Sequence, residues 1–162
     1  MGFWSRLLGR KDRVETGGEQ RTSVRAVSLL PPERVTAGGL PRHAIAGVFR
    51  GGGSEPSAFE VNPEFVRLLH EVIRERAPGD AGCRAEAQRM GHGWLYVLDM
   101  RHAPGTGHVP PEDIVGYFQV EDGRLVPGSY TPNPRHLVFS DSGLVRLPGA
   151  LHEALLEALQ RP

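Results

Sequence analysis

The sequence has one cysteine, one lysine and no long apolar run. Cys83 alone can form no internal disulfide and excludes a cysteine metal cluster. No apolar stretch approaches the roughly 18 residues that a membrane-spanning helix requires. Residues 3–8 are too few for the apolar core of a signal peptide. These absences predict a cytoplasmic protein.

Charge is unevenly distributed, although the formal net charge is +0. Residues 1–13 carry four basic residues and one acidic residue, a balance of +3. Residues 61–162 carry ten arginines and thirteen acidic residues, a balance of −3. Since the larger part lacks a broad basic surface, we expect no nucleic-acid partner. The excess of arginine over lysine is interpreted as a bacterial-like genomic composition rather than a functional signal.

Residues 1–9 form an amphipathic pattern, and basic residues follow at 10–13. Four apolar side chains recur at helical spacing: Phe3, Trp4, Leu7 and Leu8. In a helix of this kind the apolar side chains enter the lipid headgroup boundary while the arginines meet phosphates. The same stripe fits a groove on a partner protein, and the alternative is a leader that packs on its own domain. We expect an amphipathic cationic leader at 1–9, a flexible linker at 10–22, and a peripheral membrane contact through residues 1–13.

Three helices are predicted in the remainder. Asn62 can cap the first, Pro63 suits its first position, and the helix is expected to end near Ala77. Its apolar residues follow the helical period: Phe65, Leu68, Leu69, Val72 and Ile73. A weaker helix is predicted over residues 82–90, and a last one over 149–160.

Strands are predicted between these helices. Residues 93–101 alternate as a strand, which we interpret as central and covered on both faces. Strands at 114–121 and 124–126 are joined by Asp122-Gly123, a pair typical of a tight hairpin. A second hairpin is predicted from 136–139 to 144–147. The pattern indicates an α+β domain over residues 23–162, most clearly over 61–160, with a mostly antiparallel sheet of about four to six strands and helices on one face.

Acidic and histidine side chains gather in sequence near the end of the strand at 93–101. The group that could bind a divalent ion is His92, Asp99, His102, His108 and Asp113. The spacings match no metal motif, so no metal or other cofactor is expected. Asp99 and Arg101 lie on one strand face, and a structural ion pair between them is the favoured interpretation.

The segment at residues 130–136 is stiff and polar. Pro132 and Pro134 fix their own backbone angles and hold the preceding residues extended. We interpret it first as a joint between two hairpins. As a preorganised contact surface, it would present four side chains: Tyr130, Asn133, Arg135 and His136.

No catalytic motif is present. This favours a non-enzymatic protein-binding or adaptor domain that its leader recruits to a membrane surface or a larger assembly. The alternative is a small metal-assisted hydrolase with Asp99, His102, His108 and His136 as its catalytic residues. A third possibility is a small-ligand sensor with a pocket between the sheet and the helix at 63–77.

Overall fold

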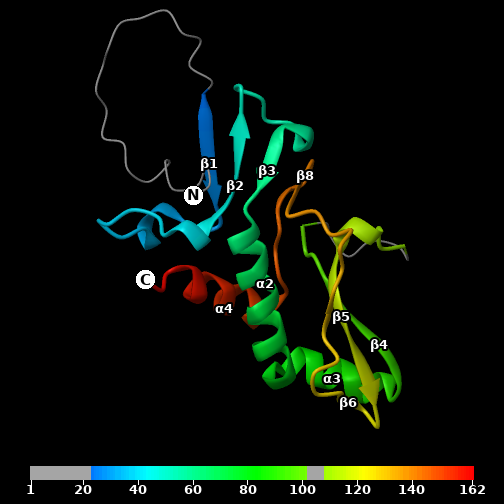
Figure 1. Cartoon of the computed structure of the whole chain (residues 1–162). Coiled ribbons are helices and arrows are strands. Elements are labelled where there is room, and N and C mark those ends of the chain that lie inside the picture. The colour runs from blue at the N-terminus through cyan, green and yellow to red at the C-terminus, as the bar shows by residue number, and fades with distance from the viewer. Residues whose placement is uncertain (1–22, 102–107) are drawn as a thin grey trace, which may run out of the picture.

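The computed structural model describes residues 23–101 and 108–162. Within these ranges the chain forms three helices and three antiparallel sheets (Figure 1). The predicted α+β class and antiparallel pairing are confirmed. The strands divide among three sheets, however: residues 62–92, which are mostly helical, separate the first sheet from the second along the chain, and residues 133–138 separate the second from the third. The predicted leader at 1–9 and linker at 10–22 lie outside the described residues.

The first sheet has the order β1-β2-β3. Its strands are β1 (Val24–Ser28), β2 (Ile45–Arg50) and β3 (Phe59–Val61). β2 lies in the middle, and all of its residues except Arg50 are buried. The connections between these strands contain single-turn 3-10 helices at Pro32–Arg34, Arg42–Ala44 and Pro56–Ala58.

The second sheet has the order β4-β5-β6, and β7 also pairs with β5. Its strands are β4 (Gly93–Leu98), β5 (Ile114–Glu121), β6 (Arg124–Leu125) and β7 (Thr131–Pro132). The hairpin between β5 and β6 is confirmed. Asp122 and Gly123 both have positive φ, 47° and 70°, which a primed two-residue turn requires. The predicted second hairpin is shorter than expected, with only β8 (Phe139–Ser140) and β9 (Gly143–Leu144) paired.

The expectation that the strand at 93–101 is central was wrong. Among the described strands β4 pairs with β5 only, so it lies at an edge of its sheet. Regular pairing stops at Leu98. Beyond it, the backbone N–H of Met100 donates to the carbonyl of Arg146 at 2.7 Å, so the chain there joins the loop before the last helix.

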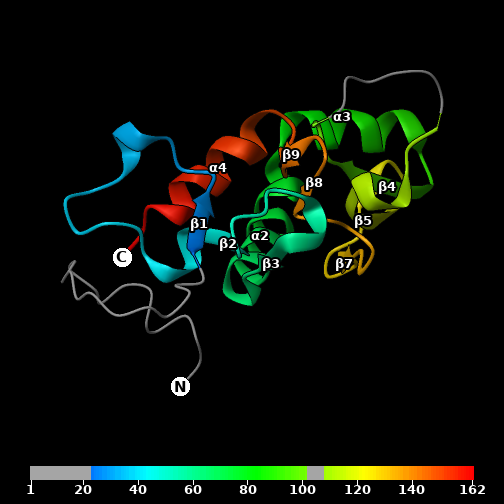
Figure 2. The ribbon, with the colours of Figure 1, turned by 90° about the horizontal axis from the view of Figure 1, so that it is seen from above.

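Three helices supply much of the core: α2 (Pro63–Arg76), α3 (Ala81–Met90) and α4 (Gly149–Leu159). The predicted cap is confirmed, because Asn62 Oδ1 accepts the backbone N–H of Glu64 at 3.0 Å. The Asn62 amide also donates to the carbonyls of Arg42 and Ile45, which fixes the start of α2 against the first sheet. Figure 1 shows α2 below the first sheet and beside the β4–β5 sheet, and in Figure 2 α2 overlaps β2 and β3 while β4 and β5 lie to its right. One buried cluster takes residues from both of these sheets and all three helices.

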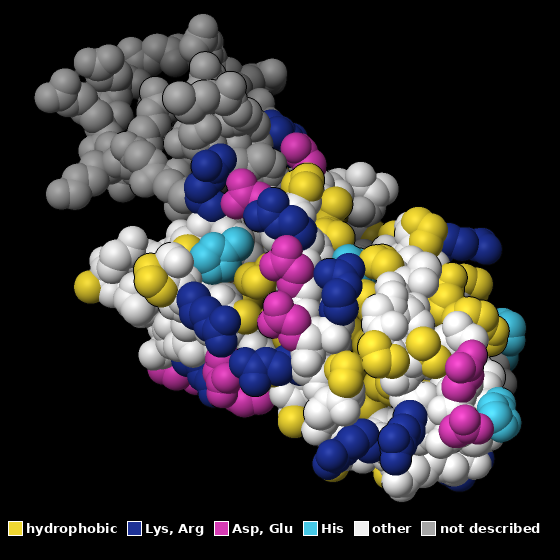
Figure 3. All heavy atoms as spheres, turned by 60° about the horizontal axis from the view of Figure 1, so that its bottom comes forward, with side chains coloured by type: hydrophobic (Ala, Val, Ile, Leu, Met, Phe, Trp, Pro, Cys, Tyr) yellow, Lys and Arg dark blue, Asp and Glu magenta, His cyan; other side chains and the backbone are white. Residues whose placement is uncertain are grey.

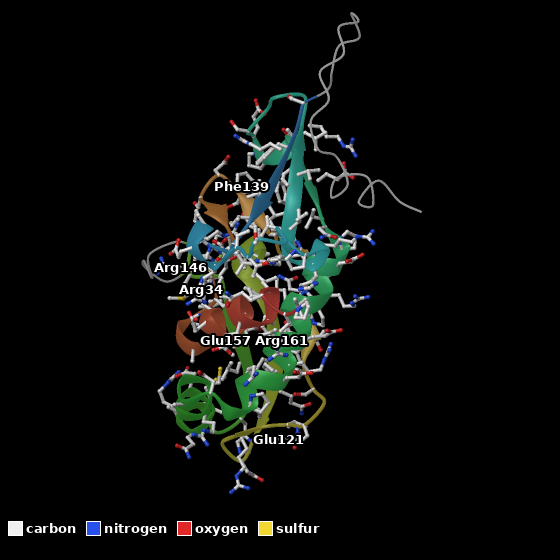
Figure 4. The ribbon with its side chains drawn as sticks, turned by 90° about the vertical axis from the view of Figure 1, so that its left-hand side faces the viewer. Arg34, Glu121, Phe139, Arg146, Glu157 and Arg161 are labelled. Atoms are coloured by element: carbon white, nitrogen blue, oxygen red, sulfur yellow. The ribbon has the colours of Figure 1, made fainter. Side chains whose placement is uncertain are left out.

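Aromatic contacts join β8 to the first sheet. The Phe139 ring lies 5.0 Å from those of Phe49 and Phe59, centroid to centroid. Figure 4 shows Phe139 in the upper half of the molecule beside the first sheet, with Glu121 at the opposite end. The segment from β7 to β8 therefore spans the two sheets.

Candidate functional site

A buried carboxylate, Asp99, organises the end of β4. Its Oδ2 accepts from Arg101 Nη2 and from His136 Nε2, each at 2.9 Å. Its Oδ1 accepts the backbone N–H groups of Arg101 at 3.2 Å and of Arg146 at 3.0 Å. Both carboxylate oxygens are thus occupied by two donors each. The predicted Asp99–Arg101 ion pair is confirmed.

The guanidinium of Arg101 extends the network to two more segments. Its Nη1 donates to the carbonyl of Gly143 at 2.8 Å, and its Nη2 donates to that of Leu137 at 2.6 Å. Asp113 Oδ1 lies 3.8 Å from Nη2. Burying a charged pair is costly unless further hydrogen bonds satisfy it. Here carbonyls satisfy Nη1 and Nη2, whereas the buried Nε has no partner among the described residues. The network ties together the chain around residues 99–101, 137 and 143–146.

The structure brings together part of the Asp/His cluster singled out in the sequence. His136 contacts Asp99, whereas His92 lies at the surface, 4.0 Å from Asp122. His108 is exposed, and His102 lies outside the described residues. Within residues 23–101 and 108–162 no three His, Cys, Asp or Glu side chains are grouped so as to hold a metal ion. Burial raises the pKa of Cys83 to about 12, which keeps its thiol protonated and unreactive.

The proline segment acts as a joint. The Asn133 amide donates to the carbonyls of Pro111 and Ile114, at 2.7 Å each. Its Oδ1 accepts the backbone N–H of Arg135 at 3.1 Å. Asn133 thereby fastens the segment to the start of β5. Of the four side chains proposed as contacts here, that of Arg135 is exposed, whereas the Tyr130 ring is buried and His136 is bound to Asp99.

Tyr130, which is buried, pairs with a half-buried side chain that the sequence did not reveal as its partner. Its hydroxyl lies 2.8 Å from Nδ1 of His70 on α2. The Tyr130 ring has room because residue 116 is glycine; a Cβ there would come within 2.5 Å of the hydroxyl. Burial, together with the nearby His136 and Arg74, lowers the pKa of His70 to about 4. The His70 imidazole is therefore neutral at pH 7.

The outer face of the β4–β5 pair carries exposed aromatic side chains. Trp94 and Tyr96 are 49% and 52% exposed, although an apolar side chain on a covered strand would be buried. Tyr117 on β5 is the strand partner of Tyr96, and its ring centroid lies 5.4 Å from that of Trp94 and 6.1 Å from that of Tyr96. In Figure 3 hydrophobic side chains gather on the right-hand part of the molecule, the half that contains β4 and β5. We name Trp94, Tyr96 and Tyr117 the aromatic face.

A groove of about 580 Å³ runs beside the aromatic face. Arg89 and Met90 of α3 line one side, and Trp94, Tyr96 and Leu98 of β4 line the other. The groove therefore lies where α3 meets β4, next to the exposed rings of Trp94 and Tyr96. Sequence reasoning placed Trp94 and Tyr96 on one strand face but missed their exposure, since aromatic residues are also typical of covered faces.

Neither a model of a known protein family, nor a curated protein, nor a solved structure matches the chain. The described helices include none that is long and apolar enough to cross a membrane.

Proposed function

We propose that the chain is a non-enzymatic protein-binding module that pairs an extended segment of its partner with the edge of β4. The observation that supports this most directly is the exposure of Trp94 and Tyr96 on an edge strand. Exposed aromatic side chains mark protein contact sites, because they bury a large apolar area with little loss of side-chain entropy.

The backbone of β4 specifies the shape of the partner. The edge facing away from β5 is not paired by any strand in the part of the chain that the structure describes. Such an edge offers main-chain donors and acceptors to an added strand. Every second side chain of that strand would pack on the aromatic face and the groove beside it, and the others would point to the opposite face of the sheet. Hydrogen bonds then provide affinity, and the aromatic face provides selectivity.

In this proposal residues 1–13 have a separate role, which is to recruit the protein to a membrane surface or an assembly. Their balance of +3 and the apolar stripe of Phe3, Trp4, Leu7 and Leu8 suit an anionic membrane surface or an acidic assembly. A single short amphipathic stretch binds weakly, so the leader raises local concentration and β4 makes the specific contact.

The test is affinity capture from native cell extract with four baits: the full chain, the double variant Trp94→Ser/Tyr96→Ser, the variant Val35→Ser, and the fragment 14–162. Val35 is exposed but lies away from β4, so it is the matched control. We expect a protein retained by the full chain and by Val35→Ser and lost with the double variant. Hydrogen exchange should then show slower exchange of β4 amides in the complex.

Three outcomes would contradict the proposal. Equal capture by the double variant would place the contact elsewhere. Unchanged exchange of the β4 amides would exclude strand addition. Unchanged membrane or assembly association of fragment 14–162 would remove the addressing role of the leader while leaving the β4 contact intact.

A further inference from the structure

A second groove, of about 490 Å³, lies between β3, α2 and residues 132–139. Its walls are mostly apolar, with contributions from Phe59, Val61, Val66, Leu137, Val138 and Phe139. Small-molecule sites commonly have volumes of about 300–1,000 Å³ and apolar walls with a few polar groups. The groove therefore has the size and lining of a ligand site, and it lies on different strands from the aromatic face.

Two histidines supply polar groups to this groove, His70 from α2 and His136 from the proline segment. Each has one ring nitrogen engaged: His136 Nε2 with Asp99 and His70 Nδ1 with Tyr130. The other nitrogens, His136 Nδ1 and His70 Nε2, make no hydrogen bond within the described residues. Each ring is thus fixed by one partner, and its other nitrogen has no hydrogen-bond partner within the described residues.

The protonation of the two rings follows from their partners. A carboxylate only accepts, so His136 Nε2 carries a hydrogen and Nδ1 accepts when the ring is neutral. Burial raises the pKa of the Tyr130 hydroxyl, which stays protonated. When that hydroxyl donates to His70 Nδ1, the hydrogen of His70 resides on Nε2. His70 Nε2 then offers a donor to a carboxylate, and His136 Nδ1 becomes a second donor when that ring takes up a proton from solvent.

Local charge favours an anionic head group over a neutral one. Burial lowers the pKa of His70, and Arg74 and a protonated His136 lower it further, so cationic groups stand close to the two histidines. The Arg74 guanidinium lies 5.6 Å above the Tyr130 ring, next to His70. The nearest negative charge behind His136 is Asp99, and Arg101 offsets it at 2.9 Å.

We propose that this groove binds a small amphipathic carboxylate, with its apolar body between Phe59 and Leu137 and its carboxyl group at the two histidines. An aliphatic or aromatic monocarboxylic acid of about ten heavy atoms fits a groove of this volume. Its carboxylate accepts from His70 Nε2 and, after one proton is taken up from solvent by His136, from His136 Nδ1–H.

The test is calorimetric titration of the full chain with sodium octanoate, and with 1-octanol as the uncharged probe of equal chain length. We expect saturable binding of octanoate at one site and binding of 1-octanol at least about tenfold weaker, as expected from one charge-assisted hydrogen bond. Val61→Trp, at a 41% exposed position in the groove wall, should fill the groove and abolish binding. Val35→Trp adds the same ring outside the groove and should leave binding unchanged.

The variant His70→Gln tests the contact with the ligand's head group separately from the contacts with the apolar walls of the groove. It should weaken octanoate binding about tenfold and leave 1-octanol binding unchanged. Three results would overturn the proposal: no saturable octanoate binding up to about 5 mM, equal affinity for the two probes, or octanoate binding that survives Val61→Trp. Circular dichroism of each variant verifies that a loss of binding is not a loss of fold.

Discussion

Replacement of Asp99 by alanine is expected to destabilise the fold by about 3–5 kcal/mol, the cost of breaking a buried ion pair by removing one partner. The carboxylate accepts four hydrogen bonds, two of them from the side chains of Arg101 and His136. Hydrogen bonds to charged groups contribute about 1.5–3 kcal/mol each. The substitution also leaves the Arg101 side chain, which is 2% exposed, without its carboxylate. The loss is a large part of the roughly 5–15 kcal/mol that stabilises a typical domain.

Urea denaturation followed by circular dichroism measures this loss as a lower midpoint at unchanged slope. Asp141→Ala removes the same charged group from an exposed position nearby and should change the free energy of unfolding by no more than about 0.5 kcal/mol. In the double variant Asp99→Ala/Arg101→Met the buried cation is gone as well, so the loss should be smaller than the sum of the single losses. A loss below about 1 kcal/mol for Asp99→Ala would refute the structural role assigned to this network.

Two further predictions concern the Tyr130 side of the core. Gly116→Ala places a Cβ 2.5 Å from the Tyr130 hydroxyl and 2.8 Å from a backbone oxygen of β7. In a thermal melt this variant should lose about 1–3 kcal/mol of stability. The control Gly79→Ala, which has open space around the added Cβ, should change stability little. Because the pKa of His70 is about 4 in the fold and 6.5 ordinarily, the unfolded chain binds more protons between these values, and stability falls as the pH drops from 6.5 to 4. The full shift corresponds to about 3 kcal/mol, which solvent screening of the partly exposed ring reduces to about 1–2 kcal/mol. In urea denaturation at several pH values, the free energy of unfolding of His70→Gln should fall less steeply between pH 6.5 and 4 than that of the unchanged chain. An equally steep fall would contradict the lowered pKa of His70.

Local signals in the sequence were sufficient for the helices and one hairpin. Asn62-Pro63 and the apolar period after it specify α2 without reference to the rest of the chain, since a cap and a stripe act within a few residues. Asp122-Gly123 specifies its turn for the same reason. The exposure of β4 could not be predicted in this way. Alternation assigns Leu95 and Val97 to one face and Trp94 and Tyr96 to the other, but it does not say which other element covers either face.

The pairs His136–Asp99 and His70–Tyr130 show the same limit of prediction from local sequence. The Asp99–Arg101 pair joins residues two positions apart and was predicted, whereas His136 reaches Asp99 from 37 residues away. His70 meets Tyr130 across 60 residues. One signal was present in the sequence: His70 lies next to Leu69 on the buried side of α2, where a polar side chain needs a partner. The identity of that partner depends on how the segment after β6 returns across β5.

The Asp99 network connects the two proposed binding sites through rigid structure. On one side, the carboxylate holds His136 in the wall of the groove between β3, α2 and residues 132–139. On the other, it lies just past Leu98, where it fixes the end of the strand that carries Trp94 and Tyr96. Groups held in their bound geometry lose less entropy when a ligand or partner arrives. A buried carboxylate with four donors therefore preorganises both proposed surfaces, and it has no free oxygen with which to act itself as a general base or a metal ligand.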